Sequence, residues 1–155
     1  ILLERGFQVV MLRDEGNAKL SPMNRAIAAG ESGADIMVII SCRKRQDIGQ
    51  RGAMAYTQRK DNPYVADLYP ECKSLAESLL SEYCAEGIFE NNGIHKTDNV
   101  VAINWSNIPA ANILLGCISD PEDEQKLADE NNWYAMAEGI ANGIENYYGK
   151  VKGWI

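Results

Sequence analysis

The stretch PAANILLGCISDPEDE, residues 109–124, carries the strongest fold signal in the sequence. Its first part, residues 110–118, is an apolar run of strand length, which is typical of a buried strand. Asp120 then precedes Pro121 and stands three residues before Asp123, a pattern that predicts a capped helix start. A buried strand that passes through a short turn into a helix indicates an α/β protein.

The rest of the chain gives the same alternation of strand and helix signals. Residues 1–6 have the composition of a helix end closed by Gly6, and NNG at residues 91–93 predicts a turn. We expect one α/β domain over residues 1–155, with a mostly parallel or mixed sheet between layers of helices. Further strands are predicted at 7–12, 34–42, 52–58 and 100–105, with 52–58 the less buried, and helices at 22–33, 67–86 and 131–148.

Composition and charge exclude several classes of partner. The chain has 155 residues and a net charge of −7, which disfavours binding to nucleic acid or to anionic membranes. No apolar run approaches the roughly 20 residues of a membrane-spanning helix, so we expect no membrane insertion. The four cysteines form no CxxC pair, and free thiols are favoured, although their even number leaves disulfides open: Cys42, Cys72, Cys84 and Cys117.

The residues alone offer no convincing catalytic group. His95 is the single histidine, and no HExxH or paired-cysteine spacing accompanies it. A triad of Ser41, His95 and Asp98 is disfavoured because no GxSxG turn surrounds the serine. The acidic run that starts at Asp120 is explained by stabilisation of a helix start.

Five segments, taken together and in order, carry a family resemblance. The chain resembles the catalytic domain of zinc-dependent N-acetylmuramoyl-L-alanine amidases, particularly the clostridial type. The segments are LLERGFQVVMLRD (2–14, with the Arg13–Asp14 step), LSPMNRAIAAGESGADIMVII (20–40), KDNPYVADLY (60–69), INWSNIPA (103–110) and GCISDPEDE (116–124).

The resemblance implies a mixed sheet of about six strands flanked by helices, and a zinc-dependent hydrolase. In the family the zinc is held by a histidine after the first strand, a glutamate in the next helix and a second histidine at a later strand end. A further glutamate acts as general base and activates the zinc-bound water, which cleaves the amide between N-acetylmuramic acid and L-alanine.

Carried over residue by residue, the resemblance predicts that the chemistry is lost. The first histidine and glutamate would precede Ile1, so the family's N-terminal strand and helix are expected to be missing from this chain. The second histidine falls on Ser41 and the general base falls on Leu114. A hydroxyl is a poor zinc ligand and leucine carries no proton, so we expect no catalytic residue, no metal site and no zinc cofactor.

The face that bore the chemistry could still bind a ligand. Strand alternation puts Asn112, Leu114 and Gly116 on one face, which the family turns toward the zinc. Polar residues there would offer donors to a glycan or to a peptide carboxylate, and an ordinary strand-end role is an equal alternative. The candidate cleft-lining residues are Ser41, Arg43, His95, Lys96 and Asn112.

Three functions follow from this sequence. The first is a catalytically inactive, hydrolase-like amidase relative that is secreted to the bacterial cell wall and binds peptidoglycan or a wall protein. The second is an active zinc amidase whose metal site uses unexpected ligands or is completed by another segment. The third is a purely structural or assembly domain with a filled cleft. The sequence does not determine the oligomeric state or the ligand.

Overall fold

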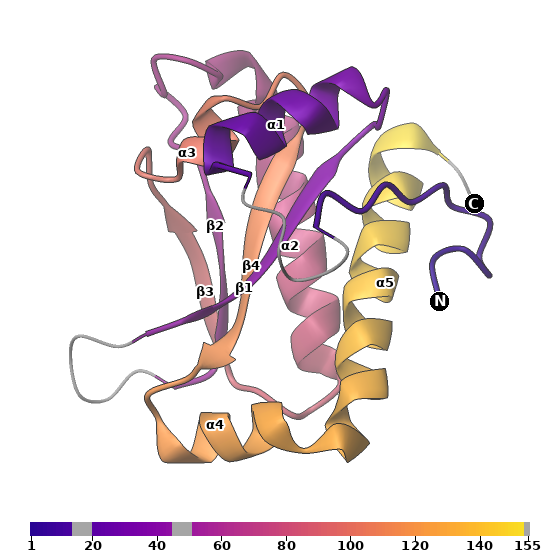
Figure 1. Cartoon of the computed structure of the whole chain (residues 1–155), viewed down its shortest axis with the longest axis vertical. Coiled ribbons are helices and arrows are strands. Elements are labelled where there is room, and N and C mark those ends of the chain that lie inside the picture. The colour runs from indigo at the N-terminus through magenta and orange to yellow at the C-terminus, as the bar shows by residue number, and fades with distance from the viewer. Residues whose placement is uncertain (14–19, 45–50, 154–155) are drawn as a thin grey trace.

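The computed structural model describes residues 1–13, 20–44 and 51–153, apart from the side chain of Lys152 (Figure 1). Asp14, named in the resemblance, lies outside the described residues. The elements in chain order are α1 (Pro22–Glu31), β1 (Met37–Arg43), β2 (Ala53–Thr57), the 3₁₀ helix η1 (Ala66–Leu68), α2 (Tyr69–Ala85), β3 (Asn91–Lys96), α3 (Val101–Asn104), β4 (Ala110–Cys117), α4 (Pro121–Ala128) and α5 (Glu130–Lys152).

The sheet of the described residues has four strands in the order β1-β4-β2-β3. β1 pairs with β4 in parallel, β2 pairs with β3 in parallel, and β2 and β4 are antiparallel. The predicted α/β class with a mixed sheet is therefore confirmed. The family resemblance implied about six strands, two more than the described part of the chain forms.

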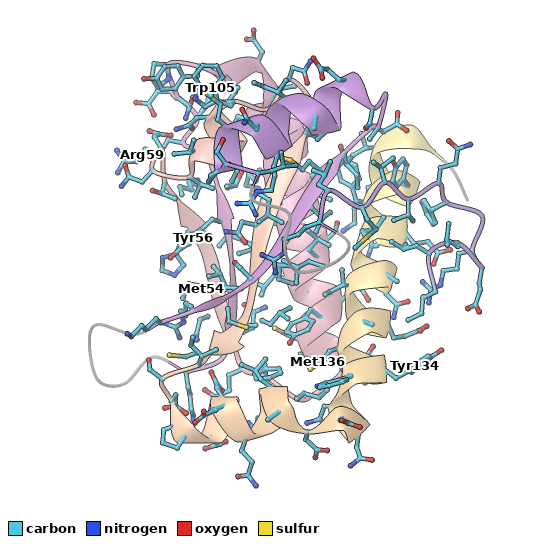
Figure 2. The ribbon with its side chains drawn as sticks, viewed as in Figure 1. Met54, Tyr56, Arg59, Trp105, Tyr134 and Met136 are labelled. Carbon is cyan, nitrogen blue, oxygen red and sulfur yellow. The ribbon has the colours of Figure 1, made fainter. Side chains whose placement is uncertain are left out.

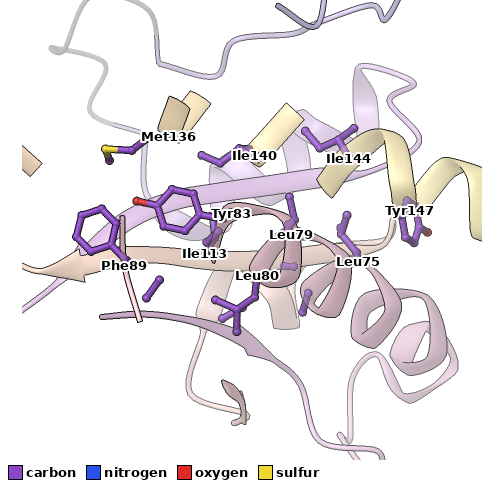
Figure 3. Close-up of a cluster of buried hydrophobic side chains, with 14 of the residues drawn as sticks. Leu75, Leu79, Leu80, Tyr83, Phe89, Ile113, Met136, Ile140, Ile144 and Tyr147 are labelled. Atoms are coloured by element: carbon purple, nitrogen blue, oxygen red, sulfur yellow. The ribbon is translucent and has the colours of Figure 1, made fainter. Parts of the chain in front are cut away.

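Helices cover both faces of this sheet and make three layers (Figure 1). Helices α2 and α5 pack on one face, where Leu79, Ile140 and Ile113 belong to the main apolar core (Figure 3). The two helices approach closely, since a Cβ on Gly143 would stand 2.6 Å from the Cα of Leu79. Helices α1 and α3 build a smaller core on the opposite face, around Met37 of β1.

Side chains cap two helix starts, and the cap at Asp120 is one that the sequence predicted. The hydroxyl of Ser21 accepts a hydrogen bond from the Asn24 N–H at 3.1 Å and opens α1. The Asp120 carboxylate accepts from two N–H groups of the first turn of α4, at 3.1 and 3.2 Å. Such local pairs satisfy donors that a helix start leaves free, which is why the sequence reveals them. No helix of the described residues is both long and apolar enough to cross a membrane.

The strand predicted at residues 7–12 is wrong. These residues form no strand, and Val10 and Met11 are exposed. Residues 1–6, predicted as a helix end, form a turn and no helix. The turn does close at Gly6, whose φ is +83°, where the Phe7 N–H donates to the Leu2 carbonyl at 3.0 Å. An apolar run favours a strand only when a neighbouring strand supplies its ladder, and composition does not reveal that partner.

Two further predictions fail near β3. Residues 100–105, predicted as a strand, contain α3, whose end is held by a hydrogen bond of 2.6 Å from the Asn104 amide to the Asp98 carbonyl. The NNG turn at 91–93 is instead the start of β3. Gly93 has a φ of +81° where the register with β2 shifts, so its turn-like signal comes from a bulge.

The predicted burial of two strands is reversed. β2 was expected to be less buried than β1, yet Ala53 and Ala55 of β2 are completely buried. β1 lies at the edge of the described sheet, and Ile40 is 54% exposed. The position of a strand in the sheet decides how deeply it is buried, and the alternation of apolar and polar residues does not encode that position.

Candidate functional site

The ends of the two parallel strands β1 and β4 bring the two carried-over positions together. Ser41 is the Cα partner of Leu114, and Ile39 is the partner of Asn112. The pleat therefore puts Ser41, Asn112 and Leu114 on the face that carries α1 and α3. There the Ser41 hydroxyl donates a hydrogen bond to the Asn112 side-chain oxygen at 2.9 Å.

The neighbouring strand β2 makes this face apolar beside Leu114. Met54 is the Cα partner of Leu114, and Tyr56 is the partner of Asn112. Leu114 is 5% exposed and Met54 is similarly buried. Directly opposed side chains on one face of an antiparallel pair lie close enough to interact. The position where the resemblance places a general base is thus a buried apolar position.

His95 shares this face but stands far from Ser41. It is the Cα partner of Tyr56, and the two rings meet edge to face with centroids 6.2 Å apart. His95 is exposed, and β4 and β2 separate its strand from β1. Three strand spacings amount to roughly 14 Å, so His95 and Ser41 do not contact one common small group.

Lys96 lies on the opposite face of the sheet. Its neighbour two residues earlier, Ile94, packs against the core under α2 and α5. The Lys96 ammonium lies 5.6 Å from the ring centroid of Tyr69, at the start of α2. Lys96 therefore does not line the face that carries Ser41.

Arg43 follows Ser41 beyond an irregularity in the β1–β4 ladder. It pairs with Cys117, and its carbonyl accepts a hydrogen bond from the Ile118 N–H at 2.9 Å. The structure therefore joins Ser41 and Asn112 beside Leu114 and puts Arg43 next along the strand.

A cavity among the described residues lies elsewhere, away from the ends of β1 and β4. It measures about 460 Å³ and lies between segment 7–13, α1 and β1, where Val10, Met37 and Tyr148 contribute to its wall. None of the five residues predicted to line a cleft borders this cavity.

Asp123 fixes the end of β4. It is buried, and one carboxylate oxygen accepts from the Gly52 N–H at 2.7 Å and from the Cys117 N–H at 2.9 Å. These bonds join the start of β2, the end of β4 and the first turn of α4. The sequence signalled Asp123 only as part of a helix start, because its partner Gly52, just before β2, is 71 residues away in the chain.

The side chains at the strand ends do not match a zinc ligand set. Over residues 1–13, 20–44 and 51–153, no group of three or more His, Cys, Asp or Glu side chains is placed to hold a metal ion. The Ser41 hydroxyl is engaged with Asn112, and protein zinc sites use thiolate, imidazole and carboxylate ligands. The four cysteines are free, and burial raises the pKa of Cys72 and Cys84.

The three-layer architecture, with polar groups at the ends of parallel strands, defines an α/β protein with a candidate site at the sheet's strand ends. The family model described as N-acetylmuramoyl-L-alanine amidase matches residues 1–146. The chain belongs to this family.

Solved structures support the same fold. The N-acetylmuramoyl-L-alanine amidase from Clostridium difficile 630 is 29% identical, with a TM-score of 0.81 over 94% of this chain and 74% of that one. The amidase Ami1 from Mycobacterium smegmatis, 18% identical, is similar in fold alone, with a TM-score of 0.82 over 96% of this chain and 70% of that one.

A curated relative matches part of the chain. The probable cell wall amidase LytH from Staphylococcus saprophyticus is 28% identical over 76 residues, which are 49% of this chain and 26% of that protein. The matched stretch therefore spans about a quarter of that relative.

Proposed function

We propose that this peptidoglycan amidase-like domain retains the amidase fold without the amidase reaction and binds peptidoglycan or a wall protein at the cell wall. The observation that carries the proposal is the buried Leu114 with Ser41 as its register partner. By resemblance these are the general-base and zinc-ligand positions, and they are neighbours in space.

The position of Leu114 lacks a group that could take a proton from an attacking water. A general base must accept a proton within hydrogen-bond reach of the attacking water. Leu114 has no group that can do so, and the polar side chains beside it on this face are a hydroxyl and a neutral amide, Ser41 and Asn112. Neither titrates near neutral pH.

The position of Ser41 lacks a group suited to hold a catalytic zinc ion. In a hydrolytic zinc site the ion lowers the pKa of a bound water and polarises the scissile carbonyl. Ser41 would have to ligate it as a neutral hydroxyl while giving up its hydrogen bond to Asn112. The residues present do not fit that role, so we propose that the chain holds no catalytic zinc through them.

Family membership supports the cell wall as the place of action. The match to a probable cell wall amidase covers about half of the chain, and the acidic net charge of −7 disfavours nucleic acid as a partner. We therefore propose an extracellular or wall-associated location. The burial of Met54 and Leu114 equally suits the alternative of an assembly domain whose cleft has filled.

Two measurements on the purified protein test the proposal. Sedimentation with insoluble peptidoglycan at low salt should retain the protein, and its absence from the pellet would favour the assembly role. Zinc titration followed by metal analysis should give far less than one ion per chain after dialysis. One tightly held zinc per chain would overturn the proposed loss of the metal site.

A further inference from the structure

Two large aromatic side chains are exposed at the edge of the sheet where β1 and β4 begin, opposite the edge where these two strands end. Tyr64 is 72% exposed and Trp105 is 56% exposed. Tyr64 follows β2, which runs antiparallel to β4, and Trp105 precedes β4, so both lie where β2 ends. Grouped exposed aromatic side chains mark interaction sites more often than isolated ones.

A buried asparagine ties the two aromatic loops together. The Asn62 amide donates to the Asp98 carboxylate at 2.7 Å and to the Asn104 side-chain oxygen at 2.9 Å. The Asn62 oxygen accepts from the N–H groups of Tyr64 and Val65 at 2.9 and 3.0 Å. With two donor and two acceptor bonds, the Asn62 side chain holds the Tyr64 loop directly against the segment before Trp105.

The Trp105 side of this junction is equally fixed. The Trp105 N–H donates to the Val101 carbonyl at 3.1 Å, and the exposed Val101 side chain lies one helical turn earlier on the same side. The Asn104 amide donates to the Asp98 carbonyl at 2.6 Å. The backbone on both sides of the junction is therefore held in place, so a ligand does not have to order these two loops.

Charged groups border the aromatic pair. The Arg59 N–H donates to the Asp98 carboxylate at 3.0 Å, and the exposed Arg59 guanidinium lies 4.0 Å from it. The hydrogen bonds from the Arg59 N–H and the Asn62 amide lower the pKa of Asp98, which keeps it ionised at neutral pH. Arg59 and Trp105 lie at the same corner of the molecule in Figure 2.

We propose that this aromatic corner, defined by Tyr64, Trp105 and Val101 with Arg59 and Asp98 at its border, binds the glycan strand of peptidoglycan. Flat sugar faces present C–H groups that pack on the negative face of an aromatic ring. Ring hydroxyl and acetamido groups pair with charged side chains at the border. The inference rests on the proposed wall-binding function and names the ligand class and the surface.

The residue types favour sugar over other ligands. Nucleic acid also stacks on aromatic rings, but the net charge of −7 opposes its phosphates. A protein partner generally requires a broader apolar surface, whereas the corner includes one aliphatic side chain, Val101. A glycan strand carries no phosphates and does not require a broad apolar surface, so it suits this corner better than nucleic acid or a protein.

The test measures binding of an N-acetylglucosamine tetramer, and of peptidoglycan glycan strands stripped of stem peptides, by NMR titration. Trp105→Ala and Tyr64→Ala should each weaken binding about tenfold, equivalent to a stacking contact of about 1.4 kcal/mol. Trp133→Ala and Tyr134→Ala are matched controls, since these side chains are 52% and 70% exposed at the start of α5. Trp105→Phe should retain part of the affinity.

Either of two results overturns the inference: wild-type protein that binds neither glycan, or equal binding by the corner variants and the controls. Thermal melts of each variant exclude unfolding as the cause of a loss. Retention on whole walls without glycan binding would leave the proposed function standing through a wall protein or stem peptide. Loss of wall retention with glycan binding intact would count against the proposed function and leave the glycan-binding corner standing.

Discussion

Leu114→Glu restores a carboxylate at the position that the family uses for its general base, and we predict a large, pH-dependent loss of stability. Leu114 is 5% exposed, opposite Met54 on one neighbouring strand and Ser41 on the other. Its buried side chain contributes about 1.5–3 kcal/mol. Burial without a cation raises the pKa of a carboxyl group by up to about 3 units, or about 4 kcal/mol when the group is ionised.

The sign of the pH dependence follows from the raised pKa in the folded state. Below the unfolded pKa of about 4.3 the new carboxyl is protonated in both states, and the variant loses only the leucine packing. As pH rises toward the folded pKa, the loss grows by up to about 1.4 kcal/mol per pH unit and then levels off. At pH 8 the two contributions together reach up to about 5.5–7 kcal/mol, a large share of a domain's stability.

Urea unfolding of wild type, Leu114→Glu and Leu114→Gln at pH 5 and pH 8 measures this effect. Glutamine has nearly the shape of protonated glutamate but does not ionise, so its cost should be the same at both pH values. A glutamate variant whose loss equals that of glutamine at pH 8 would show a solvated carboxylate. That outcome would refute the argument that this position is an apolar one closed to a working base.

Three further predictions concern the scaffold. Asp123→Ala should cost about 2–4 kcal/mol in urea unfolding, because two buried backbone N–H groups lose their acceptor at 2.7 and 2.9 Å; an unchanged midpoint would exclude the role assigned to this carboxylate. Gly143→Ala should lower the melting temperature, since its Cβ would stand 2.6 Å from the Leu79 Cα. Helix propensity alone predicts the opposite, a gain of about 1 kcal/mol, so a raised melting temperature would contradict the close packing. Alkylation followed by mass spectrometry should show that exposed Cys42 is labelled before Cys84, because burial raises the pKa of Cys84 to about 11. Labelling of Cys84 should become faster as the pH approaches that value. Equal labelling rates at pH 8 would contradict the structure.

Features encoded by neighbouring residues were predictable from the sequence. The Asp120 cap and the strand at 110–118 were predicted because a cap and an apolar run are local signals. The strand predicted at 7–12 failed because a strand also requires a ladder partner. The burial of β2 depends on its central position, which becomes visible only once the strand order is known.

In the candidate site, too, some features could be predicted from the sequence and others depend on the strand order. The positions of Ser41 and Leu114 came from family resemblance, and parallel pairing of their strands brings them together. Met54 could not be predicted beside them, because its contact depends on an antiparallel strand between β4 and β3. Lys96 lies on the face opposite Ser41, a placement that depends on the pairing of β3 with β2 and on the order of the strands.

Release of stem peptides from purified peptidoglycan most directly tests the claim that the fold is kept without its reaction. The protein is incubated with peptidoglycan in the presence of zinc or of a chelator, and soluble peptides that begin with L-alanine are quantified by mass spectrometry. We predict no peptide above the protein-free blank in either condition. Zinc-dependent release that the chelator abolishes would contradict this prediction and would assign a working amidase site to this chain.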